Sequence, residues 1–436
     1  MSDYLFMLEN HLSVDQNRVV AQVQALASQA GMSLFLTGGA MRDMLGGFHV
    51  RDLDFTVEGN ALKLGKELAA ATGARIVAVD ELRRSMELVF SGWVTAGIAM
   101  ARQEQYPRPG AKPLVTPGTI QEDLRGRDFT VNAIALSLSR ASRGLLIDPT
   151  NGLADIGRRE LRAVHSTALY DDPSRLLRYL RLRVRLGYET EEKTKGQYAG
   201  ARAAQMERHI GRRALGEELR HIAEEPSPAE LIRTLEQEGL LHLFCGALTG
   251  SKLNRPGLVK LERVRRAIPP DAGLHDFNWG HFLYVLAERL GPKDKAALIR
   301  STDLRKSEVT VWQALPGRAR KLERELKSPR LKKPSQIYAV LAPAAGDQIL
   351  FLLYQSPVRL VHDRIKNYFQ KYLPLAQQVT DADVQAAGAT PRTFAKVKAD
   401  LIAARLDGRN RKPSAPPVEV LRPEPPPRGR RPMTRT

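Results

Sequence analysis

The spacing of apolar and polar positions changes along the chain. Up to about residue 150, short apolar or alternating segments predict strands, and segments with helical spacing lie between them. A capping box from Ser13 to Gln16 predicts the start of a helix. Strands are predicted at 34–37, 55–57, 74–79, 85–90 and 93–99, and further helices at 40–45 and 61–71. The pattern therefore predicts an N-terminal head in which helices accompany a mixed sheet.

From Asp172 onward the apolar positions recur at helical spacing, and prolines separate the segments. The fold class predicted is α+β, with the head followed by an all-α neck, body and tail. We place the head at residues 1–150, the neck at 151–245, the helical body and tail at 246–410, and a last segment at 411–436. That last segment is rich in Pro and Arg and lacks periodicity, which predicts disorder.

Residues 36–57 hold the strongest candidate chemistry. A predicted strand meets Gly38 and Gly39, and a helix is predicted to follow, so backbone N–H groups at the turn can approach an anion such as phosphate. Asp52 and Asp54 stand two residues apart at a predicted strand, and side chains at i and i+2 point to the same face. Two carboxylates held so close repel unless a cation lies between them, and Mg²⁺ suits carboxylate and phosphate oxygens. An isolated Asp-x-Asp is more often a solvated strand edge, but the adjacent Gly-Gly turn favours a metal site.

These residues resemble the class II tRNA nucleotidyltransferases and bacterial poly(A) polymerases of the DNA polymerase β superfamily. The family opens with GGxVRDxLLG, a spacer and DxD, and the matching residues here are Gly38, Gly39, Arg42, Asp43, Leu45, Gly46, Asp52 and Asp54. Residues 124–135 resemble the RRDFTxNA segment and supply Arg127, Asp128 and Asn132. Residues 148–155 resemble a DPxxGxxDL turn, and residues 171–175 resemble an EDxxR block.

The resemblance implies a role for each matched residue. Asp52 and Asp54 are the expected catalytic residues and Mg²⁺ ligands. Nucleotide binding is expected from Gly38, Gly39, Arg42, Arg127, Asp128, Asn132, Asp172, Arg175 and Arg178. Within this set Asp172 and Arg175 are expected to select the base, because a carboxylate accepts from an amino group and a guanidinium donates to base-edge acceptors.

The segment after Asp172 also has an ordinary structural interpretation. Asp172 can serve as an N-cap with Pro173 in the first turn. Arginines at 175, 178, 181 and 185 share one helix face, which is most often a solvated face, and the position of Arg175 in the EDxxR-like block makes it the exception.

Two positions depart from the family pattern. Gly126 replaces an Arg expected to face nucleotide phosphates, and Gly97 stands where a strand motif usually carries a carboxylate near the metal. The missing carboxylate predicts weaker metal binding and weaker catalysis, unless Glu104 or Asp128 compensates for it.

The charge of the chain favours a polyanionic partner. Its net charge is +19 and its pI near 10.1, which fits RNA and also an anionic membrane surface. Residues 411–436 contribute +5 of this charge, which leaves +14 on the rest. Residues 252–266 and 318–333 are especially basic and suit contact with a tRNA backbone, although exposed helix faces explain them equally well.

Other features exclude several classes of protein. The single cysteine, Cys245, excludes an internal disulfide and an all-cysteine metal site, and its apolar neighbours predict a buried thiol. The dipeptides His275-Asp276 and His362-Asp363 lack the partners of a metal phosphohydrolase and are interpreted as structural. Neither a leader nor an apolar run of about 20 residues is found, so no membrane span and a cytoplasmic location are expected.

The predicted function is template-independent addition of CCA, or part of it, to tRNA 3′ ends from CTP and ATP, with release of pyrophosphate. Poly(A) polymerase activity on RNA 3′ ends is the nearest alternative, because both activities share the four blocks. A catalytically degenerate RNA-binding member is a second alternative, motivated by Gly97 and Gly126. A nucleotidyltransferase for a small molecule or a protein is a weaker third, and the oligomeric state stays open.

Overall fold

The head is built on one seven-stranded sheet with the strand order β3-β4-β5-β2-β1-β8-β9. The computed structural model describes residues 3–269 and 279–408. The strands are β1 (Ser33–Thr37), β2 (Leu53–Glu58), β3 (Arg75–Asp80), β4 (Ser85–Val89), β5 (Thr95–Met100), β8 (Ala135–Ser137) and β9 (Leu146–Ile147). β2 and β5 run parallel, whereas the other neighbouring pairs are antiparallel. The sheet is therefore mixed, as predicted.

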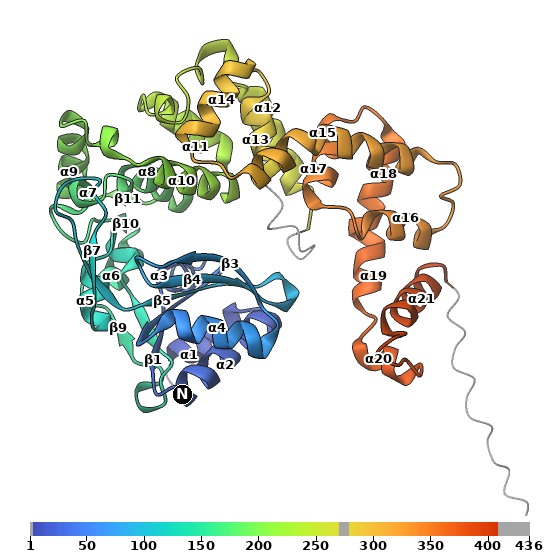
Figure 1. Cartoon of the computed structure of the whole chain (residues 1–436), viewed down its shortest axis with the longest axis horizontal. Coiled ribbons are helices and arrows are strands. Elements are labelled where there is room, and N and C mark those ends of the chain that lie inside the picture. Colours follow the sequence, from blue (N-terminus) through green and yellow to red (C-terminus); the bar gives the residue numbers. More distant parts are fainter. Residues whose placement is uncertain (1–2, 270–278, 409–436) are drawn as a thin grey trace, which may run out of the picture. The chain divides into compact units, whose positions relative to one another are not determined.

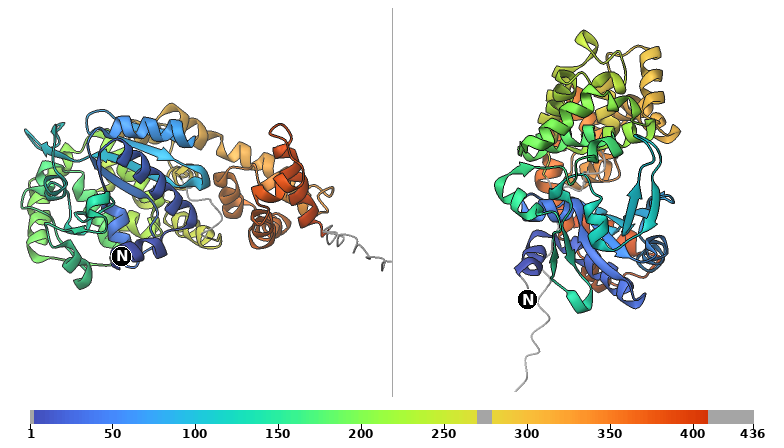
Figure 2. Two further views of the ribbon diagram at one scale, coloured as in Figure 1. Left: turned by 90° about the horizontal axis from the view of Figure 1, so that it is seen from below. Right: turned by 90° about the vertical axis from the view of Figure 1, so that its left-hand side faces the viewer.

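Alternating burial gives the sheet a core face and an open face. On β2, Leu53, Phe55 and Val57 are fully buried, whereas Asp54 is only partly buried on the opposite side. The core face packs against α2 (Val14–Gln29) and α4 (Ala61–Thr72), which run side by side (Figures 1 and 2). Helix α1 (Asp3–His11) precedes them. The core helices thus leave the other face of β2 available for chemistry.

Most predicted elements of the head are confirmed. The capping box from Ser13 to Gln16 begins α2, and the predicted strands at 74–79, 85–90 and 93–99 are β3, β4 and β5 within one or two residues. Helix α3 (Gly38–Leu45) begins at the first glycine itself, two residues earlier than predicted. The loop that follows β5 carries a hairpin of β6 (Arg102–Gln105) and β7 (Leu114–Pro117), which the Pro-rich sequence did not indicate.

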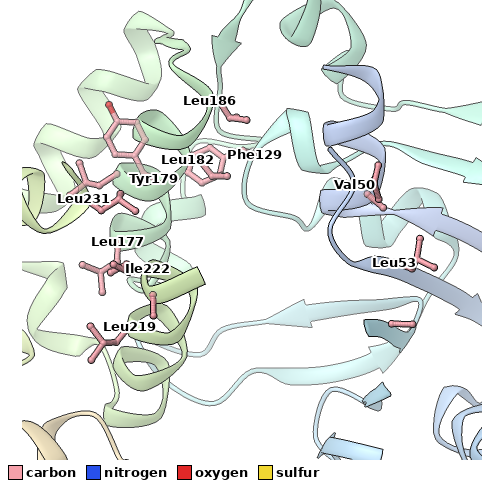
Figure 3. Packing of buried hydrophobic residues seen from close by; sticks show 14 of the residues in the cluster. Val50, Leu53, Phe129, Leu177, Tyr179, Leu182, Leu186, Leu219, Ile222 and Leu231 are labelled. Carbon is pink, nitrogen blue, oxygen red and sulfur yellow. The ribbon is translucent and has the colours of Figure 1, made fainter. Parts of the chain in front are cut away.

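One further helix of the head, α5, and the elements that connect the head to the helical part complete this region. They are α5 (Ile120–Arg125), α6 (Gly152–Arg158), β10 (Glu160–Leu161), α7 (Ala168–Asp171), α8 (Arg175–Leu186), β11 (Glu189–Thr190), α9 (Glu192–Ala203), α10 (Arg212–Glu224) and α11 (Pro228–Gln237). β10 and β11 pair in parallel. Apolar side chains of α8, α10 and α11 are buried together, among them Leu177, Leu219, Ile222 and Leu231 (Figure 3). The neck is therefore held by ordinary helix packing.

The chain continues as helices, which confirms the predicted fold class. They are α12 (Arg255–Arg266), α13 (Trp279–Ala287), α14 (Pro292–Ser301), α15 (Lys306–Lys327), α16 (Pro334–Leu341), α17 (Gly346–Gln355), α18 (Arg359–Asn367), α19 (Leu373–Gln377), α20 (Asp381–Ala386) and α21 (Phe394–Leu406). Two compact units divide the chain: residues 1–324 with 344–362, and residues 325–343 with 363–436. Head and neck thus belong to one compact unit, and the four-part division stays a prediction.

Several smaller predictions can be placed. Cys245 is a buried free thiol, as predicted. The ring Nε2 of His362 lies 2.8 Å from the carbonyl oxygen of Ser356, which agrees with a structural role. His275-Asp276 and the tail at 411–436 lie outside the described residues. Among the described helices, none alone has the length and apolar character to cross a membrane, although α16 and α17 pass that test as a bent pair.

Candidate active site

Asp52 and Asp54 lie at the start of β2 on the open face of the sheet. Oδ2 of Asp54 accepts a hydrogen bond from the backbone N–H of Gly39 at 3.1 Å, and Oδ1 of Asp52 accepts one from the hydroxyl of Thr95 on β5. Burial and then the charge of Asp52 raise the pKa of Asp54 to about 6, although Arg127 and the Gly39 N–H act in the opposite direction. The two carboxylates are therefore close enough to repel, which favours a cation beside them.

Gly38 and Gly39 let the backbone of α3 approach Asp54. Gly38 has a φ of +64°, which other residues rarely adopt. A Cβ added at Gly38 would lie 3.2 Å from Oδ2 of Asp54 and 3.2 Å from Nη1 of Arg127. One added at Gly39 would also lie 3.2 Å from Oδ2 of Asp54. The glycines thus bring a helix N-terminus and a carboxylate together, where sequence reasoning considered only phosphate.

Arg127 lies beside Asp54 on the open face of the sheet. Its Nη2 donates to Oγ1 of Thr37 at 3.2 Å and to Oγ1 of Thr56 at 3.1 Å. Its Nε donates to Oδ1 of Asp123 at 2.9 Å, and its Nη1 to the carbonyl oxygen of Asn132 at 3.1 Å. The guanidinium is therefore fixed where it lowers the pKa of Asp54.

Four other predicted nucleotide-binding residues are linked in one series of hydrogen bonds. Nη1 of the buried Arg42 donates to Oδ1 of Asn132 at 2.7 Å, and Nδ2 of Asn132 donates to Oδ1 of Asp128 at 3.0 Å. Oδ2 of Asp128 accepts from Nη1 of Arg178 at 2.8 Å. Although burial acts in the opposite direction, Arg178 and Arg175 hold the pKa of Asp128 well below its ordinary value. Asp128 therefore stays ionised between the head and α8.

Further ion pairs close this series of hydrogen bonds into a ring that joins the head to α8 and α10. Nε of Arg178 donates to Oε1 of Glu218 at 3.1 Å, and Nε of Arg181 donates to Oε2 of the same carboxylate at 3.1 Å. Arg181 continues to Glu225, Glu225 to Arg185, and Arg185 to Asp43, whose other oxygen accepts from Arg42. We call this set the charged ring; its members are Arg42, Asp43, Asp128, Asn132, Arg178, Arg181, Arg185, Glu218 and Glu225.

The charged ring corrects the interpretation of the arginine stripe. The side chains of Arg181 and Arg185 are 10% and 9% exposed, so their face of α8 is not solvated. The interpretation of this face as solvated was wrong because acidic residues of α3 and α10 cover it. The hydrophobic pattern of α8 alone carries no signal for partners that lie about 40 residues away.

Asp172 and Arg175 lie near this site but are already engaged. Helix α8 begins at Arg175 with Ser174 as its N-cap residue, so the prediction of Asp172 as N-cap was wrong. Oδ1 of Asp172 instead accepts from the backbone N–H of Ser174 at 3.0 Å and from its hydroxyl at 2.6 Å. The buried Arg175 donates to the carbonyl oxygens of Ala168 at 3.3 Å and Gly126 at 3.1 Å. Their role in selecting a base stays a prediction.

The carboxylate pair provides a donor set for Mg²⁺. Mg²⁺ is commonly held by one or two carboxylates together with substrate phosphates, and Asp52 and Asp54 supply such oxygens on one face. Within residues 3–269 and 279–408 no group of three or more His, Cys, Asp or Glu side chains could hold a metal by itself. The residues therefore fit an ion that is shared with a phosphate.

Gly97 lies where the sequence comparison placed it, beside Asp54. The parallel register of β2 and β5 pairs the two residues directly, and a Cβ at Gly97 would lie 3.5 Å from Oδ1 of Asp54. The suggested substitutes differ in their surroundings. Glu104 is engaged by Arg83, Arg102 and Tyr106, and Asp128 belongs to the charged ring, so both carboxylates have partners already.

A mixed sheet in which a Gly-Gly helix start faces an Asp-x-Asp strand is the arrangement that the resemblance implies for a nucleotidyltransferase head. Residues 34–162 match the poly A polymerase head domain. The head of this chain is thus similar to the poly A polymerase head domain over less than half of the chain. The resemblance stated from the four sequence blocks is confirmed for the head.

Relatives of this chain are named as tRNA nucleotidyltransferases. It is 29% identical over 342 residues to an A-adding tRNA nucleotidyltransferase of Aquifex aeolicus, with 77% of this chain and 40% of the relative covered. It is 36% identical over 242 residues to a CC-adding tRNA nucleotidyltransferase of Deinococcus radiodurans, with 53% and 63% covered. The chain thus spans less than two thirds of the length of these curated relatives. A solved apo structure of a CCA-adding enzyme has the same fold, with a TM-score of 0.52, 24% identity and coverage of 94% and 96%.

Proposed function

We propose that the protein is a template-independent RNA nucleotidyltransferase that adds CCA, or part of it, to tRNA 3′ ends from CTP and ATP. The observation that carries the proposal is the pair Asp52 and Asp54 against the N-terminus of α3, in a head that matches the poly A polymerase head domain. The cytoplasmic location stays a prediction.

Each part of the site has a task in this reaction. The N-terminus of α3 at Gly38 and Gly39 receives the triphosphate, for which the Gly39 N–H exchanges its hydrogen bond to Asp54, and Arg42 or Arg127 balances the charge. Asp52 and Asp54 hold Mg²⁺, which when bound supplies Lewis-acid stabilisation to attack of the RNA 3′-hydroxyl on the α-phosphate and to the leaving pyrophosphate. Asn132 and Asp128 keep Arg42 and Arg178 in place.

Asp172 and Arg175 are the proposed base-selecting pair, with Arg178 beside them. Asp172 accepts from the base amino group, and Arg175 donates to a ring acceptor. Because Arg175 now donates to two carbonyl oxygens, pairing with a base requires that it exchange at least one of them. The same template would serve CTP and ATP, since both bases present an amino group.

The substrate is tested with three transcripts of one tRNA, which end before the CCA, after its first C, and after CC. Each is incubated with Mg²⁺ and CTP, ATP or both, and products are resolved at single-nucleotide resolution. Growth of the shortest transcript by three nucleotides that requires both substrates supports CCA addition. Extension of the CC-ended transcript alone, by ATP, indicates A addition, and growth that stops after CC indicates CC addition.

A matched pair of variants tests the site. Asp54→Asn should abolish incorporation, because it removes one of the two charges that hold the cation, whereas Glu67→Gln makes the same chemical change at a side chain that is 43% exposed on α4. Full incorporation by folded Asp54→Asn would overturn the assignment of the metal site. A long ladder with ATP alone would instead establish poly(A) polymerase activity.

A catalytically degenerate RNA-binding member is the second candidate. It is favoured by Gly97, which leaves no side chain beside Asp54, and by Gly126, whose position carries no cation. This candidate predicts salt-sensitive RNA binding without incorporation for all three transcripts. Any incorporation that depends on Asp54 rejects it.

A further inference from the structure

The four arginines predicted to bind the nucleotide differ in how accessible they are. Arg42 and Arg175 are buried, and the side chain of Arg127 is 21% exposed. The side chain of Arg178 is 34% exposed. Its Nε and Nη1 donate hydrogen bonds within the charged ring, whereas no described residue accepts one from its Nη2. Arg178 thus combines an accessible side chain with a nitrogen that can donate to a ligand.

Two carboxylates fix the guanidinium of Arg178 from different sides of the fold. Oε1 of Glu218 on α10 accepts from Nε at 3.1 Å, and Oδ2 of Asp128 in the head accepts from Nη1 at 2.8 Å. Charge-assisted bonds to two nitrogens of a planar group set its position and its orientation. Glu218 is itself held in place, because its side chain is 2% exposed and its Oε2 accepts from Nε of Arg181 at 3.1 Å.

Arg178 lies within electrostatic reach of Asp172. Although burial acts in the opposite direction, the charges of Glu218, Asp128 and Asp172 raise the pKa of Arg178 above its ordinary value. Asp172 belongs to the proposed base-selecting pair, so Arg178 serves the same part of the site. A donor that is fixed before the ligand arrives loses little conformational entropy on binding.

We propose that Glu218 is a positioning residue for nucleotide binding, which orients Arg178 so that Nη2 donates to the incoming nucleoside triphosphate beside Asp172. The inference rests on the proposed function, because that function makes Arg178 a nucleotide-binding residue. Glu218 acts only through Arg178, from another helix and 40 positions further along the chain.

Calorimetric binding of CTP and of ATP to the full chain, with Mg²⁺ and without RNA, tests the proposal. Glu218→Met should weaken nucleotide binding about tenfold, because Arg178 then keeps only one of the two bonds that fix it. Glu225→Met is the matched control, since Glu225 is also buried and pairs with Arg181 and Arg185 of the same helix but not with Arg178. This control should lower the thermal stability as well, but it should change nucleotide affinity by less than about twofold.

A double variant shows whether Glu218 acts through Arg178. Arg178→Met should weaken nucleotide binding by itself, and adding Glu218→Met to it should cost less than about a further twofold. Glu218→Gln keeps one acceptor oxygen and is the milder variant to use if Glu218→Met does not fold. Its expected loss of nucleotide affinity is about threefold.

The outcomes separate this inference from the proposed function. Circular dichroism first establishes that each variant is folded. Equal nucleotide affinity of the parent and the Glu218 variants overturns the inference, as does an equal loss in Glu225→Met or a full loss on top of Arg178→Met. If no tested RNA is extended, the proposed function fails, whereas a loss of nucleotide affinity confined to the Glu218 variants still supports the role of Glu218. In an active protein, Glu218→Met should raise KM for the nucleotide about tenfold and lower kcat by less than about threefold.

Discussion

Asp54 makes the metal-free protein sensitive to pH. Its pKa in the folded state, about 6, lies above the ordinary value, so the folded state holds this proton more tightly than the unfolded chain. The resulting stability is fully present below the ordinary carboxyl pKa and is lost as pH rises through about 6. At pH 7.5 ionised Asp54 therefore destabilises the fold, and Asp54→Asn should stabilise it by roughly 1–3 kcal/mol.

Thermal unfolding in a metal chelator between pH 4 and pH 8 measures this effect. The gain from Asp54→Asn should shrink toward pH 4, and Mg²⁺ should stabilise the parent more than the variant. A gain of equal size at every pH would show that the ionisation of Asp54 is not its cause.

Alanine substitutions at Gly38 and Gly31 separate the effect of backbone strain from the effect of a side chain pressing on its neighbours. Both have left-handed conformations, with φ of +64° and +65°, but a Cβ at Gly31 would meet nothing within 4 Å. Alanine at either position should cost about 1 kcal/mol of unfolding free energy, because an L side chain is strained there. Only Gly38→Ala should also lose incorporation, since its methyl group would press on Asp54 and Arg127. Equal loss of incorporation in both variants would contradict this reason.

Residues of the site were predictable where their chemistry is local in sequence. Gly38, Gly39 and Asp54 stand at a turn and on a strand that the hydrophobic pattern predicts, whereas the hydrogen bond from Gly39 to Asp54 was not predicted. The contact of Arg185 with Asp43 carried no such signal, because the two residues stand 142 positions apart in the sequence. It depends on how α8 packs against α3, which no local pattern specifies.

Helices α8 and α10 are joined by buried charges as well as by apolar packing. Arg181→Met should destabilise the protein by about 3–5 kcal/mol, because Glu218 and Glu225 would lose a partner while they stay buried. Arg183→Met is the matched control on the same helix. Its side chain is 37% exposed and lies 3.7 Å from Glu238, so its loss should cost less than about 1 kcal/mol.

Urea denaturation of the two variants measures this difference. Similar midpoints for Arg181→Met and Arg183→Met would show that the charged ring adds nothing to stability beyond the packing of α8.

Helices and strands were predicted well where one face of the element is apolar. They were predicted poorly where side-chain hydrogen bonds determine the residue at which the element begins. The periodicity of α4 gave its start at Ala61, whereas the start of α8 was misplaced because Asp172 caps Ser174 rather than the helix. The strand β7 was missed because prolines and glycine surround it in the sequence, although pairing with β6 supplies its hydrogen bonds.

At the scale of the whole molecule, net charge governs RNA binding in the proposed function. Affinity for tRNA should fall steeply as salt rises, because phosphate contacts release counterions. Removal of residues 411–436 takes away +5 of the +19, so the slope of log affinity against log salt should become shallower while binding persists. Filter binding at several salt concentrations measures both slopes. Complete loss of binding in the shortened chain would place the RNA contacts in that segment.

The charged ring also constrains how this protein can change over evolutionary time. Replacing any one charged member of the ring leaves an opposite charge buried without its partner. A single substitution there therefore lowers fitness until a second substitution removes the unpaired charge. Descendants of this sequence should therefore change ring residues jointly rather than singly, with positions 43 and 185 among those that change together. Such joint inheritance would link a helix of the neck to the α3 segment of the head across more than 130 positions of sequence.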